Sequence, residues 1–230
     1  MSARSLRAVL PTAFAALVLY GPSAKGECLA VTEPDVTVDI QAEPVSTVFD
    51  TSLGELEVLA TAAGKRSRMP LMAAYSAAVL YTVDIPTQAG STRSGTFCAT
   101  SKSVRVRIVI GQRTIHAARE LQGRPCLLAT AIGRAEAHAR NQEKSLGVME
   151  AGIIKNIKDR VRDAAYLRSP SAQEAERQLT SSIAAQIDQD LQKAEAEEKE
   201  ANRRPDTPDS LHALQASCAL DRSILFGGGT

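Results

Sequence analysis

Residues 125–168 read PCLLATAIGRAEAHARNQEKSLGVMEAGIIKNIKDRVRDAAYLR and decide the fold predicted for this chain. Small or apolar side chains recur here at steps of three and four residues, with one polar exception at Gln142, so one side of a long helix faces a core. These positions are Leu128, Ile132, Ala135, Ala139, Gln142, Leu146, Met149, Ile153, Ile157, Val161 and Ala164. Pro125 suits a first helical position, and Pro170 disfavours helical geometry in Ser169. We predict a helix from Pro125 to about Arg168.

A second helix is predicted directly after this one. Residues 171–174, SAQE, resemble a capping box, and apolar residues then line one face to about Asn202. They are Leu179, Ile183, Ile187 and Leu191. Two long helices joined by a short connection favour an antiparallel hairpin. A last short helix is expected after Asp206, carrying Leu211, Leu214 and Cys218 on one side.

Upstream of the helices, the pattern favours strands. Alternation indicates strands at 36–42, 72–85 and 103–110, a short helix spans 53–63, and residues 114–121 read as a strand running into a turn of helix. The predicted fold class is α+β: a small, mostly antiparallel sheet followed by a long helix and a helical hairpin.

The first 26 residues have the pattern of a secretory signal peptide. Arg4 and Arg7 precede an apolar run from Ala8 to Tyr20, and small residues then suit a cleavage site. We therefore expect a signal peptide at 1–26, a single domain at 27–220 and a disordered tail at 221–230. The mature protein is expected to be secreted or periplasmic.

Composition narrows the classes of partner. Without the leader, 24 of the 27 basic residues remain against 26 acidic ones, a balance that calls for neither nucleic acid nor an anionic membrane. Aromatic residues make up only 3% of the chain, which argues against a base-stacking surface. No segment is long and apolar enough to predict a membrane span. A protein partner of unknown identity stays open.

Four cysteines, Cys28, Cys98, Cys126 and Cys218, lie after the predicted leader. An even count in an oxidising compartment favours disulfides, and the absence of a CxxC pair argues against a zinc knuckle. Three connectivities are open. We favour Cys98–Cys126, tying a strand to the start of the long helix, together with Cys28–Cys218.

Several short motifs together resemble an uncharacterised family of secreted proteobacterial zincin-like proteins. They are FCA at 97–99, VRVRIVI at 104–110, TIHAAREL at 114–121, Cys126 at the helix start, and DTPDSLHALQASC at 206–218. The resemblance implies a zincin-like fold, with an HExxH zinc motif on the helix that follows Cys126.

At the positions of HExxH this chain instead carries Arg134, Ala135, Glu136, Ala137 and His138. Two histidines four residues apart share a helix face and grip zinc, and the glutamate beside the first acts as general base. Arg134 offers no lone pair and stays protonated. Glu136 lies about 200° around the helix from His138. We predict no catalytic residues, no metal and no cofactor here, with His138 the one ligand if a metal binds.

Three functional readings follow. The first is a non-catalytic pseudo-metallopeptidase with a binding or structural role in the envelope. The second is a zinc-dependent peptidase with a rearranged site, in which His138, His116 and a carboxylate such as Glu120 or Glu143 hold the metal, while His212 is the chain's remaining histidine. The third is a helical adaptor that docks through the helix at 171–202 and would lose its partner when Leu179 and Ile183 are made polar.

Overall fold

The computed structural model describes residues 33–62, 71–92, 94–203 and 218. The predicted leader, Cys28, His212 and the predicted tail lie outside these residues, and so does all of the predicted last helix except Cys218. The elements in chain order are β1 (Asp35–Ala42), β2 (Ser46–Thr51), α1 (Leu53–Ala62), β3 (Ala73–Asp84), β4 (Thr87–Ser91), β5 (Phe97–Ser101), β6 (Ser103–Ala118), the 3-10 turn η1 (Arg119–Leu121), α2 (Pro125–Ala164) and α3 (Ala172–Arg203).

The main sheet is built on β6, the longest strand. β1 and β2 pair in parallel with successive halves of β6 on one side, and β3 pairs antiparallel with it on the other. β4 and β5 form a separate antiparallel ladder. The main sheet is therefore mixed, whereas the sequence led us to expect a mostly antiparallel one. Parallel pairing was missed because the alternation within a strand carries no information about the direction of its neighbour.

A β-bulge divides β6 into two halves. Even-numbered residues face the core before the bulge, and odd-numbered residues face it after the bulge. Val104, Val106, Ile108 and Ile110 are buried in the first half, and Arg113, Ile115 and Ala117 in the second. The register shifts between Ser76 and Ala78, so that Gln112 and Arg113 lie opposite the single residue Ala77. Gln112 adopts a φ of 53°, outside the usual strand region. The bulge turns Arg113 towards the helices and His116 away from them.

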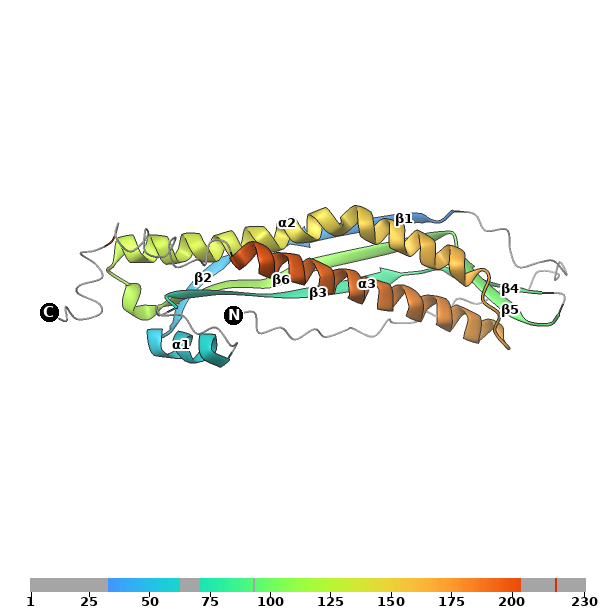
Figure 1. Cartoon of the computed structure of the whole chain (residues 1–230), viewed down its shortest axis with the longest axis horizontal. Coiled ribbons are helices and arrows are strands. Elements are labelled where there is room, and N and C mark those ends of the chain that lie inside the picture. Colours follow the sequence, from blue (N-terminus) through green and yellow to red (C-terminus); the bar gives the residue numbers. More distant parts are fainter. Residues whose placement is uncertain (1–32, 63–70, 93, 204–217, 219–230) are drawn as a thin grey trace.

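α2 and α3 form the predicted hairpin and lie across one face of the sheet (Figure 1). The predicted apolar stripe of α2 is confirmed, since most of its members are buried, including the polar exception Gln142. The helix ends at Ala164 rather than near Arg168. Beyond that end, Ser169 forms a bridge with Phe97 of β5, which ties the turn between the helices to the β4–β5 ladder.

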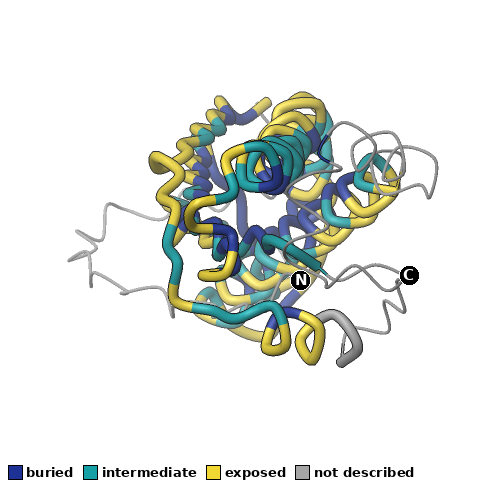
Figure 2. The backbone as a smooth tube through the Cα atoms, turned by 90° about the vertical axis from the view of Figure 1, so that its left-hand side faces the viewer, coloured by how far each residue is buried: buried dark blue, intermediate teal, exposed yellow. Residues whose placement is uncertain are grey.

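The main core lies between the helical hairpin and the sheet, as the burial pattern in Figure 2 shows. Leu179, Ile183 and Ile187 of α3 are completely buried there. An adaptor that docks a partner through Leu179 and Ile183 is therefore wrong, because these side chains already pack inside the domain. None of the helices in the described ranges is long and apolar enough to cross a membrane.

The preferred disulfide pairing needs correction. Cys126 is bonded to Cys218, so the predicted Cys98–Cys126 and Cys28–Cys218 bonds are both wrong. Cys98 is also disulfide-bonded. It belongs to β5, which meets the C-terminal end of α2 through Ser169, whereas Cys126 opens that helix. A 40-residue helix is about 60 Å long. The two cysteines are too far apart to bond.

Candidate functional site

The segment expected to hold HExxH lies in the first half of α2. Ala135 is buried in the main core, Arg134 and His138 are half-buried, and Glu136 is exposed. The Glu136 carboxylate lies 3.6 Å from Arg140, one turn further along the helix. Glu136 therefore faces solvent and pairs with a surface cation, as its position two residues from His138 requires.

The residues proposed for a rearranged zinc site are not brought together with His138. Glu143 pairs with Arg113. Glu120 accepts hydrogen bonds from the backbone N–H of Leu53, at 3.2 and 3.3 Å. His116 lies 3.1 Å from Asp50. Within the described ranges, no group of three or more His, Cys, Asp or Glu side chains could hold a metal ion.

A buried polar network joins the sheet to α2 close to this segment. The side chain of Arg113 is 5% exposed, and its guanidinium donates to the hydroxyl of Tyr75 at 3.1 Å, to the backbone oxygen of Glu43 at 2.6 Å and to the carboxylate of Glu143. The Tyr75 hydroxyl in turn donates to Oε1 of Gln142 at 2.8 Å. Each buried polar group in this chain of contacts has a partner, as the cost of burying an unsatisfied group demands.

The electrostatics of this network fit a structural role. Burial raises the pKa of Tyr75, and the neighbouring guanidinium of Arg113 opposes that rise. The hydroxyl therefore stays neutral and can both donate to Gln142 and accept from Arg113. Sequence reasoning missed Tyr75 and Arg113. The one visible signal was Gln142, a polar residue within the apolar stripe of α2.

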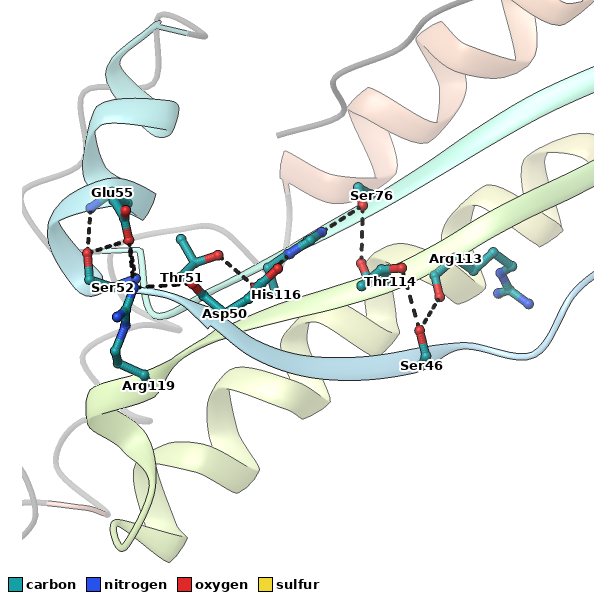
Figure 3. Close-up of polar contacts among 10 residues, drawn as sticks. All are labelled: Ser46, Asp50, Thr51, Ser52, Glu55, Ser76, Arg113, Thr114, His116 and Arg119. Atoms are coloured by element: carbon teal, nitrogen blue, oxygen red, sulfur yellow. Dashed lines mark hydrogen bonds and ion pairs between the residues drawn. The ribbon is translucent and has the colours of Figure 1, made fainter.

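Polar side chains also line the sheet face opposite α2 and α3, which we call the open face. It carries Arg105, Arg107, Thr114 and His116 of β6 together with Ser76 and Thr82 of β3. Near its β2 end, Nδ1 of His116 lies 3.1 Å from Oδ1 of Asp50, and Nε2 lies 3.2 Å from Oγ of Ser76 (Figure 3). Three side chains from three strands thus form a continuous Asp50–His116–Ser76 chain.

The carboxylate end of this chain is held in place by the start of α1. Ser52 and Glu55 form a capping box, with the Ser52 backbone N–H donating to Glu55 at 2.7 Å and the Glu55 N–H donating to Ser52 Oγ at 3.2 Å (Figure 3). Arg119 donates to the backbone oxygen of Asp50 and to the Glu55 carboxylate, each at 3.2 Å. These contacts fix the end of β2 against the end of β6.

The hydrogen bond from His116 lowers the pKa of Asp50, with a smaller contribution from the Thr51 hydroxyl. An ionised carboxylate only accepts hydrogen bonds, so Nδ1 of His116 carries the proton that faces it. In the neutral imidazole, Nε2 then presents its lone pair to Ser76. From the sequence, His116 was considered as a ligand of a rearranged zinc site, and the spacing of Asp50, Ser76 and His116 along the chain gave no sign that they meet.

Comparisons of the chain with protein-family models, with curated proteins and with solved structures found no match. The resemblance to secreted zincin-like proteins stays a prediction.

Proposed function

We propose that the protein is an exported, disulfide-stabilised, zincin-like protein whose degenerate motif, Arg134 to His138, is no zinc site, and that it acts by binding or as a structural component of the cell envelope. The observation that carries the proposal is the replacement of the first motif histidine by Arg134 and of the general base by Ala135. At about 4 Å and an effective dielectric constant near 20, a guanidinium repels a dication by on the order of 8 kcal/mol.

The surroundings of His138 support this reading. A replacement ligand would have to come from a neighbouring carboxylate, and the nearest candidate named from the sequence, Glu143, pairs with the buried guanidinium of Arg113. Releasing Glu143 to a metal would leave a buried cation without its ion pair, which is strongly unfavourable. His116 and Glu120 likewise have protein partners on other elements.

The disulfide between Cys126 and Cys218 supports export, since such bonds persist mainly in oxidising compartments. Fractionation of cells that express the full chain would test this part of the proposal. We expect the protein in the periplasm or the medium, with a mass that shows loss of the first 26 residues. Full-length protein retained in the cytoplasm would contradict it.

The test of the metal-free reading uses the purified, oxidised protein and two variants. We expect less than stoichiometric zinc by elemental analysis and no cleavage of a peptide library. His138→Ala should leave both results unchanged, as should the control Lys144→Ala, which alters an exposed residue of the same helix. Tightly bound zinc that is lost in His138→Ala but retained in Lys144→Ala would refute the proposal.

A gain-of-function variant tests the zincin-like ancestry separately. Arg134→His combined with Ala135→Glu rebuilds HExxH in this helix. If the position of a third ligand survives, the double variant should bind zinc where the unaltered protein does not. Because Ala135 is buried in the main core, failure of the double variant to bind zinc would leave the lineage open and the metal-free reading intact.

A further inference from the structure

The Asp50–His116–Ser76 chain has the contacts of a nucleophile, a base and a residue that orients the base. The base lies within hydrogen-bond distance of both partners, at 3.2 Å from Ser76 and 3.1 Å from Asp50. The contacts involve opposite edges of the imidazole, Nε2 towards the hydroxyl and Nδ1 towards the carboxylate. Residues in this relationship are recognised by geometry and role rather than by their order in the sequence.

We propose that Ser76 is an activated nucleophile that accepts an acyl group from an ester, with His116 as its general base and Asp50 as the residue that positions the imidazole. This site is separate from the Arg134–His138 segment of α2 and needs no metal. The proposal goes beyond the function proposed above, and each can fail without the other.

The alternative hydrogen bond of Ser76 is the weaker one. The hydroxyl oxygen also lies 3.5 Å from the backbone oxygen of Thr114, at the outer limit for such a bond. The Ser76 proton can point to one acceptor at a time, and Nε2 of His116 is 0.3 Å nearer and the stronger base. The proton is thus directed along the line on which it would be transferred.

The position on the open face indicates the class of substrate. The His116 side chain is 32% exposed and that of Asp50 is 59% exposed, while Ser76 is half-buried. The imidazole and the carboxylate can thus both be reached from solvent. The site therefore suits an ester group carried on the surface of a larger molecule, such as a polymer or a second protein.

The chemical step is acyl transfer. Ser76 Oγ attacks the ester carbonyl carbon while its proton moves to Nε2 of His116. The new Oγ–C bond forms, the C–O bond to the alcohol breaks, and His116 returns the proton to the departing alkoxide. Water then attacks the carbonyl carbon of the acyl-serine. His116 takes a proton from this water and gives it to Ser76 Oγ as the acid leaves. Because the oxyanion would form on an open surface exposed to water, we expect slow turnover and a readily trapped covalent adduct.

A dialkyl fluorophosphate tests the nucleophile directly, because the hydroxyl oxygen displaces fluoride and its proton passes to the base. Intact mass spectrometry of the oxidised full chain should show one dialkyl phosphoryl group, and peptide mapping should place it on Ser76. Ser76→Ala should abolish the adduct. Ser46→Ala should not, because Ser46 has hydroxyl and backbone partners on the same sheet but no imidazole.

The base is tested by His116→Gln and by pH. His116→Gln should slow labelling at least ~100-fold, the usual minimum for a general base. If that variant does not fold, the labelling rate of the unaltered protein should rise with pH and then level off, as catalysis by a single general base requires. Labelling of Ser76 no faster than that of Ser46, an unchanged rate in folded His116→Gln, or a rate that rises without levelling off would each overturn the proposal.

Discussion

The carboxylate of Glu43 accepts a hydrogen bond from the backbone N–H of Gln112, with 2.9 Å between Oε2 and N. Glu43 lies between β1 and β2, and its own backbone N–H donates to Ile110 at 3.0 Å. Its backbone oxygen accepts from Arg113. Glu43, between the edge strands β1 and β2, thus contacts residues on both sides of the bulge in β6. The bulge in turn decides which side chains of β6 face the helices.

Glu43→Ala should therefore destabilise the fold by about 1–2 kcal/mol, since it removes a charged acceptor from a backbone donor. Chemical denaturation would measure the loss. Thr37→Ala, at an exposed position of the same edge, is the matched control and should change the free energy of unfolding by less than about 0.5 kcal/mol. Equal effects of the two variants would argue against a special role for Glu43.

Gln112→Gly should stabilise the protein, by up to about 1 kcal/mol. Gln112 adopts a φ of 53°, a conformation that costs residues with a side chain but not glycine. Glycine also makes the unfolded chain more flexible, which reduces the gain. Thermal unfolding would report a higher midpoint, and a lower midpoint would show that the Gln112 side chain contributes more than its backbone strain costs.

Tyr75→Phe should cost about 1–3 kcal/mol of stability. The hydroxyl lies between Arg113 and Gln142, and its removal leaves a buried amide oxygen and a guanidinium N–H each without that partner. Tyr81→Phe, on the same strand, removes a hydroxyl that donates to Asp188 at a partly exposed position. The comparison should give the smaller loss for Tyr81→Phe, and the reverse order would contradict a structural role for the buried network.

Tyr81 should make stability fall at alkaline pH. Burial, with the hydrogen bond to Asp188 and the charge of Asp188, raises the pKa of Tyr81 to about 12. The unfolded chain ionises near pH 10, so the stabilisation is complete below about pH 10 and is lost as the pH rises towards 12. In Tyr81→Phe the free energy of unfolding should fall less steeply across this window. Parallel pH profiles for the two proteins would contradict the assignment.

Replacing Cys126 and Cys218 together by alanine should lower stability by about 2–4 kcal/mol, because the bond joins residues 92 apart and restrains a long loop in the unfolded state. Both cysteines also pack with a small cluster that includes Leu56 and Leu127. Peptide mapping without reductant gives a direct check. A fragment that links Cys98 to Cys126 would contradict the connectivity.

The sequence predicted most of the helical layer, because a periodic apolar stripe reports directly on which side of a helix is buried. Pro125 marked the first residue of α2 correctly. The end of α2 was placed too late, since the bridge between Ser169 and Phe97 depends on a contact distant in sequence. Local patterns contain no record of such contacts.

The sheet and the candidate sites were harder to predict for the same reason. The alternation at Val104 to Ile110, continued unbroken, would place His116 on the helix side. Position 112 did not indicate the bulge. It holds glutamine rather than glycine, the residue that a positive φ favours. Asp50, Ser76 and His116 lie on three strands, and only the pairing of those strands brings them together.

The measurement that tests the central claim most directly is a zinc titration of the purified, oxidised protein in an isothermal titration calorimeter. The same titration is made on the His138→Ala variant. We predict no stoichiometric binding by either protein, because in the proposed zincin-like motif Arg134 takes the place of the first zinc ligand. One zinc ion bound per chain, with that binding lost in His138→Ala, would contradict the account.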